Sequence, residues 1–501
     1  MKKKIYTIMV LLGLLFVSCN LKEDPYGFYS EDNFYKTPVD AEASLMYAYN
    51  ALTFIEYSRG IFYIGELASD ICDVKADEGY GSQQLNNWTA DGTNETLTYF
   101  FKYCFISINR SNSVIDNIVN SSFEPVIKNR LLGEAYFLRA YSYLNLVKVF
   151  GLVPIQRNMV KSISQTSPFM AKNLDELYNF INSDLRLAES CLEVNQRVGR
   201  ADKVAAQALL AKSYLTIASS KESGVPKYKD MTKDVKTMYD SAAFYSKKVL
   251  NDQSKYKLDT DLQHIYNVKY PDGPEHIFIM SSDRTGLNEG NYSKIGMMFH
   301  PWVDGVPYYI KNADNTLTYC TNGWEVFKTT DAFYSSFFIT DKRKSELLVT
   351  DVYDATGKLT ASKGGKFSYA FTRKYVDPEF VGQKSSVKPF LIRFSEVALI
   401  FSEAVGPTAD GYLWVNKIRT RAGLPNLAAG LSETAFRDAV VQERAWELAF
   451  EGQRLYDLRR KAIVTKKDPR AIAAGITEDK AAFYPLPQME IDLNTNLSNQ
   501  Q

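Results

Sequence analysis

Apolar residues recur three or four positions apart over much of the chain, which is the spacing of one face of an α-helix. In residues 126–150, small and large apolar side chains alternate along that face: Gly133, Phe137, Ala140, Leu144 and Val147. The same spacing predicts helices over residues 39–57, 97–119, 126–150, 174–192, 202–219, 236–251, 390–403, 411–421 and 433–462. We therefore expect a mostly α-helical protein.

Small residues on the apolar faces indicate that neighbouring helices pack closely. In the expected helix 202–219 the face carries Val204, Ala208, Ala211, Leu215 and Ala218. Small side chains along paired antiparallel helices are typical of tetratricopeptide repeats, whose unit of about 34 residues is one helix pair. The period is irregular in this chain, so the spacing alone leaves the repeat type open.

Residues 256–387 interrupt the helical pattern. Glycine and proline recur throughout this stretch, and short runs such as 276–280 and 367–375 have β-like composition. A smaller interruption covers residues 61–96. No low-complexity linker divides the chain, so we expect one domain over 39–501, with a helical scaffold at about 39–255 and 388–465 and a loop-rich insertion at about 256–387. Rigid helices that present long loops suit a binding protein.

The first residues have the layout of an export signal. Three lysines at positions 2–4 precede an apolar run over 5–17, which is too short to span a bilayer and ends at Ser18 and Cys19. A cysteine at this point resembles the lipoprotein signal, which predicts a signal peptide over 1–18, acylation of Cys19 and a tether over 19–38. Residues 22–24, Lys-Glu-Asp, resemble a signal for the outer face of the outer membrane. An ordinary signal with a chance cysteine is the alternative.

Charge and cysteine content exclude several classes of function. The chain has 59 Lys and Arg against 58 Asp and Glu, so no basic field for nucleic acid is expected. Cys72, Cys104, Cys191 and Cys320 are scattered without a C-x-x-C pair, and the chain has only three histidines. We expect no metal site and no cofactor. The cysteines are expected to be buried thiols, although export would permit a disulfide.

The last expected helix, 433–462, is apolar on two sides, as in a helix between two layers. Gly452 inside it would cost about 1 kcal/mol relative to alanine, which indicates a backbone approach too close for a Cβ atom. Glu443, Glu447 and Glu451 share a third side at intervals of four. This spacing lets the carboxylates pair along the helix or with neighbouring helices.

Residues 442–460, QERAWELAFEGQRLYDLRR, closely resemble the C-terminal signature of the SusD/RagB family of outer-membrane nutrient-uptake lipoproteins. The resemblance extends over nearly the whole chain, in segments 33–35, 109–112, 134–140, 150–154, 205–215, 393–396, 416–425 and 484–487. It implies about four tetratricopeptide-like helix pairs beside an irregular portion. It also implies a non-enzymatic protein on the cell surface that passes oligosaccharides, or in some members peptides, to a SusC-like TonB-dependent transporter.

A glycan site needs exposed rings flanked by hydrogen-bonding groups, because sugars have apolar faces edged by hydroxyls. The chain has 33 Tyr, 29 Phe and 5 Trp, and most of these rings must be core. Rings in the two interruptions are therefore the informative ones. We expect ligand contacts from Trp88, Trp302, Tyr309 and Trp324, with Tyr80, Asn87 and Tyr308 as further candidates. For any single ring, a role in packing its own loop is the alternative.

Two other functions compete with capture of a glycan. A glycoside hydrolase would need two acids about 5 to 9.5 Å apart, and Glu443/Glu447 or Asp70/Asp73 are the available pairs. No nucleophile-elbow, zinc-protease or phosphate-loop motif accompanies them. A helical scaffold that binds only other proteins is the second alternative. The sequence does not specify which glycan or peptide would bind.

Overall fold

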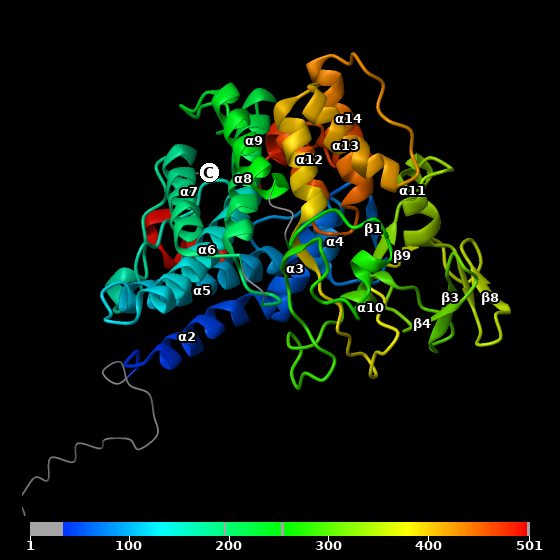
Figure 1. The fold of residues 1–501 in the computed structure, drawn as a ribbon, viewed down its shortest axis with the longest axis horizontal. Coiled ribbons are helices and arrows are strands. Elements are labelled where there is room, and N and C mark those ends of the chain that lie inside the picture. The colour runs from blue at the N-terminus through cyan, green and yellow to red at the C-terminus, as the bar shows by residue number, and fades with distance from the viewer. Residues whose placement is uncertain (1–33, 195–196, 252–254, 498–501) are drawn as a thin grey trace, which may run out of the picture.

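The structure is a computed structural model that describes residues 34–194, 197–251 and 255–497 (Figure 1). Its scaffold is a series of helices in which each packs against the next: α5 (Glu95–Ile118), α6 (Pro125–Phe150), α7 (Leu174–Cys191), α8 (Lys203–Glu222) and α9 (Val235–Asn251). The expected mostly α-helical fold with tetratricopeptide-like helix pairs is confirmed. Capping side chains, prolines and glycines near the ends of each segment determine where its helix begins and ends.

Helix α6 illustrates how the sequence positions the scaffold. The Glu124 side chain accepts a hydrogen bond from the Ile127 amide, Pro125 occupies the first turn, and Gly151 ends the helix with φ +75°. Almost every residue from 131 to 150 is buried, because α5 and α7 cover opposite sides. A Cβ atom on Gly133 would lie 2.7 Å from Cγ of Leu192. The alternation of small and large residues thus reflects close packing, as predicted.

The expected helix 39–57 is divided into α2 (Pro38–Asn50), a 3₁₀ turn η2 (Ala51–Thr53) and α3 (Ile55–Glu66). Phe54 separates them with φ −57° and ψ 134°, which is extended backbone, and its ring packs 4.6 Å from the ring of Tyr103 on α5. Tertiary packing therefore overrides the helical periodicity at this point. The chain then forms β1 (Cys72–Val74) and α4 (Tyr80–Asn86) before entering α5.

The expectation of one helix over 433–462 is also wrong, because the structure divides this segment into two helices. The structure has α14 (Glu433–Glu447) and α15 (Arg454–Arg460), joined by a turn in which Phe450 has φ +67° and Gly452 has φ +70°. A Cβ atom on Gly452 would lie 2.7 Å from Cγ2 of Ile61 on α3. The predicted close approach is confirmed, but the glycine lies in a turn and not in a helix.

The remaining C-terminal elements complete the scaffold. The expected helix 390–403 begins as strand β10 (Phe390–Arg393) and continues as α12 (Phe394–Val405), followed by α13 (Ala409–Arg421). Short helices follow α15 along the chain: α16 (Val464–Lys467), α17 (Pro469–Ala473), α18 (Glu478–Ala481), α19 (Gln488–Leu493) and the 3₁₀ turn η6 (Thr495–Leu497). Helix α17 returns the chain to α4, where Arg470 donates a hydrogen bond to Asn86.

The insertion carries the other short strands, and all of their pairings are antiparallel. Strand β2 (His276–Ile279) pairs with β10, β1 pairs with β5 (Phe327–Thr329), and β6 (Leu348–Val349) pairs with β9 (Phe371–Thr372). A four-stranded sheet has the order β4 (Leu317–Cys320), β3 (Tyr308–Lys311), β7 (Asp351–Tyr353), β8 (Leu359–Ser362). The remaining short elements are η3 (Ile163–Gln165), η4 (His264–Tyr266), α10 (Ile295–Phe299), α11 (Asp331–Ser336) and the π-turn η5 (Arg343–Leu347). The β-like run 276–280 is thus confirmed, whereas 367–375 contributes only β9.

The sheet of the insertion has a hydrophobic core separate from the large core of the helices. One face of the sheet buries Tyr308, Ile310, Cys320 and Val352 against Phe367, Tyr369 and Phe371. Figure 1 shows this lobe beside the helical scaffold, on the right of the view. Because residues alternate between the two faces of a strand, the neighbours of these buried residues point away from the lobe's core. That outward face is the starting point for the site.

Cys72, Cys104 and Cys320 are buried thiols, as expected, and Cys191 is a half-buried one. Within the described ranges, we find no helix whose length and apolar content would let it cross a membrane. The expected signal peptide over 1–18, acylation of Cys19, the charged triplet at 22–24 and most of the tether over 19–38 lie outside the described residues.

Candidate ligand-binding surface

The ring candidates divide among three places in the structure. Tyr80, Asn87 and Trp88 lie on or just after α4, and Trp324 lies between α10 and β5. Trp302 precedes strand β3, and Tyr309 lies within it. The antiparallel pairing of β1 with β5 brings the two interruptions of the helical pattern together, since Val74 is opposite Phe327. The rings themselves have different environments.

Trp88 is a correction to the expected set. Its side chain is only 6% exposed, and its indole Nε1 donates a 2.8 Å hydrogen bond to the buried carboxylate of Asp468. The expectation that Trp88 is an exposed ring is therefore wrong. Arg470 donates to the same carboxylate and to Asp73, so the indole belongs to a contact that joins the α4 segment to α17.

Tyr80 and Asn87 lie at the two ends of α4 and are exposed. Tyr80 begins the helix and is 79% exposed, while Asn87 follows its last residue and accepts a hydrogen bond from the Asn86 amide group. They were expected in a loop, whereas the structure places Tyr80 in the first turn of a short helix and Asn87 directly after its end. Both residues are exposed to solvent.

Trp324 is half buried and covered by charged side chains. The guanidinium of Arg59 lies 5.3 Å from the ring centroid, and the ammonium of Lys294 lies 5.8 Å from it. Both cations also pair with Glu289, and Lys294 does so at 2.8 Å. Arg59, Glu289, Lys294 and Tyr292 border a small cavity of about 20 Å³. A ring beneath two cations is engaged by cation–π contacts and offers a ligand little open area.

Tyr308 and Tyr309 point in opposite directions because they are neighbours on strand β3. Tyr308 is buried in the core of the lobe, so the expectation that it is an exposed ring is also wrong. Tyr309 lies on the outward face, opposite Tyr319 of β4 on one side and Tyr353 of β7 on the other. Sequence alone could not decide which of the two tyrosines faces outward.

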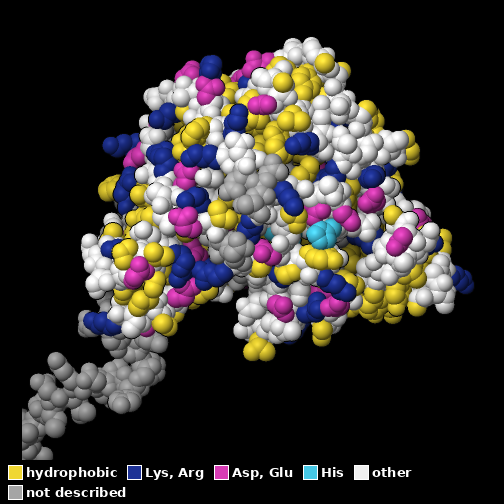
Figure 2. Space-filling view, in the orientation of Figure 1, with side chains coloured by type: hydrophobic (Ala, Val, Ile, Leu, Met, Phe, Trp, Pro, Cys, Tyr) yellow, Lys and Arg dark blue, Asp and Glu magenta, His cyan; other side chains and the backbone are white. Residues whose placement is uncertain are grey.

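Four rings cross the outward face of the sheet, and we call them the aromatic ladder: Phe380, Tyr319, Tyr309 and Tyr353. The centroids of Tyr309 and Tyr319 are 5.1 Å apart, and Phe380 stacks on Tyr319 at the same distance. Tyr319 is 37% exposed and the other three rings are half buried. Figure 2 shows hydrophobic side chains gathered at this corner of the molecule, where Figure 1 labels β4.

Polar and apolar groups flank the ladder. The ammonium of Lys311 lies 4.5 Å from the centroid of Tyr353, and Asp351 accepts hydrogen bonds from Ser362 and Thr350 at the edge of β7. Trp302, which precedes β3, is 57% exposed and is the most open tryptophan among the described residues. Its ring lies beside Gly305, where an added Cβ atom would be 3.0 Å away. Exposed rings beside charged groups are the chemistry expected for a sugar surface.

Tyr319, Tyr353 and Phe380 were missed by sequence reasoning. Strand alternation was the available signal for the two tyrosines, since each is next to an apolar residue that is buried, Cys320 in β4 and Val352 in β7. Phe380 follows a turn and reaches Tyr319 only through tertiary folding. No local pattern identifies it.

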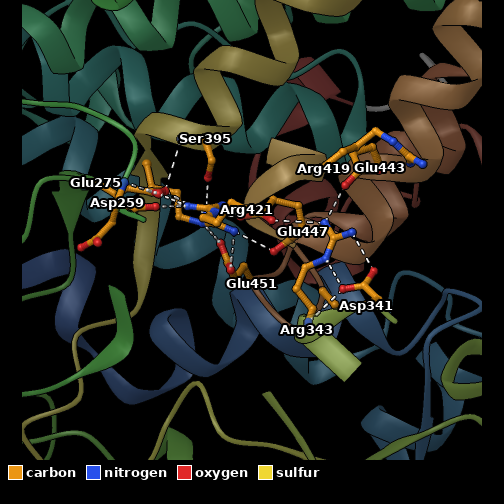
Figure 3. A network of polar contacts seen from close by, with 12 residues as sticks. Asp259, Glu275, Asp341, Arg343, Ser395, Arg419, Arg421, Glu443, Glu447 and Glu451 are labelled. Carbon is orange, nitrogen blue, oxygen red and sulfur yellow. Dashed lines mark hydrogen bonds and ion pairs between the residues drawn. The ribbon is translucent and has the colours of Figure 1, made fainter. Parts of the chain in front are cut away.

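The carboxylates that a hydrolase would use belong to a buried ion network (Figure 3). Arg343 donates to Glu443 at 2.7 Å and to Glu447 at 3.2 Å, and Arg393 donates to Glu447 at 2.7 Å and to Glu451 at 2.8 Å. All of these side chains are buried. The expected grouping of the three glutamates is confirmed, but their partners come from the insertion, β10 and α13 and not from their own helix.

Electrostatics in this network oppose acid catalysis. Burial would raise the pKa of Glu447, but Arg421, Arg393 and Arg343 outweigh burial and hold the pKa well below its ordinary value. The pKa of Glu451 is lowered in the same way by Arg393 and Lys374. A general acid needs a raised pKa, so these groups are unsuited to that role.

The other candidate pair is also engaged. Asp70 forms a bidentate pair with Arg454, at 2.6 and 2.7 Å, and Asp73 pairs with Arg470 at 2.7 Å. Across residues 34–194, 197–251 and 255–497, no three His, Cys, Asp or Glu side chains are grouped so as to hold a metal ion. The described surface therefore offers ring stacking and hydrogen bonding as its chemistry.

Comparison with known proteins supports the resemblance seen in the sequence. A family model described as "SusD family" matches residues 314–501, and one described as "Starch-binding associating with outer membrane" matches residues 29–215. SusD-like protein P2 of Formosa agariphila is 26% identical over 99% of both chains.

Solved structures of the same fold include a SusD homolog from Bacteroides thetaiotaomicron, with a TM-score of 0.75, 20% identity and coverage of 94% of this chain and 98% of that one. A laminarin-binding SusD-like protein aligns with a TM-score of 0.74 and 21% identity over 92% of this chain and 98% of its own. Sequence and fold agree along nearly the full length. The chain belongs to the SusD/RagB family.

Proposed function

We propose that the protein captures oligosaccharides or polysaccharides at the cell surface without cleaving them, and that the aromatic ladder is the surface on which they bind. The observation that carries this proposal is the orientation of the sheet in the insertion. One face of the sheet is fully used as core, while the other presents Phe380, Tyr319, Tyr309 and Tyr353 to solvent in a continuous row.

The ladder suits a sugar chain because of its regularity. Two successive ring spacings of 5.1 Å, with interplanar angles of 42° and 25°, pack the rings against one another into one apolar strip, so that a polymer can contact several rings at once. Each ring contributes apolar contact area, and neighbouring groups such as Lys311 and Asp351 can hydrogen-bond sugar hydroxyls. Multiple weak contacts along one chain raise the overall affinity.

The relatives favour a glycan over a peptide. One family model is described as starch-binding, and one solved structure of the same fold is a laminarin-binding protein. A peptide remains the second candidate ligand, because tyrosines with a polar rim also suit peptide contacts. A panel that includes both classes distinguishes them.

The cellular setting is part of the proposal. Cys19 would carry the acyl chains, residues 19–38 would tether the domain 39–501, and the helical scaffold would contact a SusC-like TonB-dependent transporter that takes up the captured glycan. Support comes from the signal-like sequence of the first residues and from the family description that includes association with the outer membrane. Several acyl chains, at about 0.8 kcal/mol for each buried CH₂, would suffice for stable anchoring.

The experiment is affinity electrophoresis of the mature protein through gels that contain starch, laminarin and other polysaccharides, with peptides tested by calorimetry. We expect retardation by at least one polysaccharide, and loss of that retardation in the double variant Tyr309→Ala/Tyr319→Ala. Phe244→Ala is the matched control, because Phe244 is an exposed ring on α9 away from the sheet.

A parallel assay of reducing ends tests the hydrolase alternative. A binder releases none from the retarding polysaccharide, whereas release that persists after purification would favour hydrolysis. Binding to peptides alone, or unchanged retardation of the double variant, would contradict the proposal.

A further inference from the structure

A small cavity inside the helical scaffold is lined by more cations than carboxylates. It has a volume of about 40 Å³ and lies where α6, α8, α14 and α15 meet. Five of its lining residues are basic: Lys148, Lys212, Arg444, Arg459 and Arg460. All five are buried. This cavity is on the opposite lobe from the ladder and has no part in the proposed capture of glycans.

Three carboxylates pair with these cations. Arg460 forms a bidentate pair with Glu403 and also contacts Asp457, which in turn accepts from Arg444 at 2.9 Å. Lys212 pairs with Glu396 at 2.8 Å. Among the described residues, five cations thus face three carboxylates, so the cavity carries an excess of two positive charges. No ion pair is described for the other two cations, Lys148 and Arg459.

Arg459 carries unused hydrogen-bond donors at the cavity wall, although its guanidinium lies 4.3 Å from the ring centroid of Tyr484. Only 5% of Arg459 is exposed, and its Nη1 atom donates to the backbone carbonyls of Lys148 and Val149 at 3.3 and 3.5 Å. Its Nε and Nη2 atoms are buried and, within the described part of the chain, have no acceptor. Arg444 is also buried, and within the described part of the chain its Nη1 atom likewise has no acceptor. A buried cation with unused donors is costly unless an anion accompanies it.

Lys148 adds to this imbalance. Its ammonium lies 4.4 Å from the ring centroid of Tyr456. Burial and the nearby ammonium of Lys212 lower the pKa of Lys148 well below its ordinary value, and the carboxylates of Glu396 and Asp457 offset this shift only in part. Burial also lowers the pKa of Arg459.

We propose that this cavity binds a small inorganic anion, such as chloride or nitrate, between Arg459, Arg444 and Lys148. Water could accept hydrogen bonds from the unused donors, but it would leave the excess charge uncompensated. A cavity needs about 10 to 15 Å³ to admit one water molecule, so 40 Å³ accommodates an ion of one or a few atoms. The anion neutralises the junction of four scaffold helices and thereby stabilises the folded state, since it binds that state alone.

Crystals of the protein grown or soaked in sodium bromide test the site directly, because bromide gives an anomalous signal. The expected result is an anomalous peak inside the cavity, within hydrogen-bonding distance of the Arg459 guanidinium. A cavity that contains ordinary water density and no anomalous peak would overturn the proposal.

Thermal unfolding provides a second measurement in solution. We expect the Tm to rise by a few degrees and to saturate as chloride replaces gluconate at constant ionic strength, because gluconate is too large for the cavity. Arg459→Gln removes one excess charge and should abolish this chloride dependence. Lys466→Gln, which changes a lysine of α16 outside the cavity lining, should retain it.

Equal Tm values of the unaltered protein in chloride and gluconate would contradict the proposal, and so would a chloride dependence that Arg459→Gln keeps in full. If Arg459→Gln does not fold, the bromide experiment on the unaltered protein still decides.

Discussion

The ion network around Arg393 and the aromatic ladder place side chains in opposite ways. In the network, charged groups from β10, α13, α14 and the insertion are buried, and Arg393 contacts Glu275, Glu447 and Glu451 together. In the ladder, apolar rings remain at the surface. The network is explained by folding, since each buried charge there meets a partner of opposite sign. The ladder rings are only partly used in packing, and this difference is the reason why we propose the ladder as the binding surface.

The two regions also differ in what a substitution should do. A change in the network should affect stability, because a partner that loses its counter-charge stays buried. A change in the ladder should affect ligand binding, because the remaining rings stay solvated. Four substitutions test this contrast.

The largest effect is expected from Arg393→Met, which leaves Glu275, Glu447 and Glu451 without one shared cation. Breaking a buried pair costs about 3–5 kcal/mol, so the free energy of unfolding in urea should fall by that amount. The control is Arg157→Met, which removes an exposed pair with Glu176 and should cost at most about 1 kcal/mol. Equal losses for the two variants would contradict a structural role for the network.

Glu66 provides a contrast with the network itself. It is a buried carboxyl beside the network, and no ion pair of Glu66 is described. Burial raises its pKa to about 8, from an ordinary value of 4.5, and its side chain accepts a hydrogen bond from the Gly452 amide. Between these two pKa values the folded state holds a proton that the unfolded state releases. The contribution of Glu66 to stability is therefore greatest below the lower value and is lost as pH rises toward 8.

The expected loss is about 1.4 kcal/mol per pH unit within this window, or about 2 kcal/mol between about pH 6 and 7.5. Urea unfolding at several pH values measures it, and Glu66→Gln should flatten the dependence by that amount. Parallel pH profiles for the variant and the unaltered protein would show that Glu66 does not hold the proton.

Trp88→Phe tests a ring that sequence reasoning assigned to the ligand and that the structure buries. The variant loses the hydrogen bond to Asp468 and leaves that carboxylate with one donor fewer, so unfolding should become easier by about 1–2 kcal/mol. Retardation in polysaccharide gels should be unchanged. Normal stability together with weakened retardation of this variant would show that Trp88 belongs to the binding surface.

Tyr319→Ala should have the smallest effect on free energy. Loss of one ring from the ladder should weaken glycan binding by about 1 kcal/mol, roughly five-fold in Kd, with little change in stability. Calorimetric titration with an oligosaccharide measures the change. An effect of the same size from Phe244→Ala would indicate non-specific contact with surface rings.

Much of the scaffold could be predicted from the sequence, because small and large apolar residues recur at helical spacing in α6 and α8, where neighbouring helices pack closely. The periodicity misled at 448–453, where Val441, Ala445, Leu448, Gly452 and Leu455 keep helical spacing across a turn. That turn is set by the contact of Gly452 with Ile61, which lies nearly 400 positions earlier in the chain.

The site was predicted less well. Composition and loop position identified the exposed Trp302 and the outward-facing, half-buried Tyr309, but they apply equally to Trp88 and Tyr308, which are buried. Exposure depends on tertiary partners such as Asp468 and on the facing of strand β3, and neither can be read from local sequence. The pairing of Phe380 with Tyr319 is likewise a product of the fold.

A crystal structure of the protein with an oligosaccharide of the retarding polysaccharide would test directly whether the aromatic ladder binds the glycan. We predict sugar rings stacked along Phe380, Tyr319 and Tyr309, with hydroxyls near Lys311. Sugar bound elsewhere, for example over Trp324 or Tyr80 with the ladder unoccupied, would contradict this assignment.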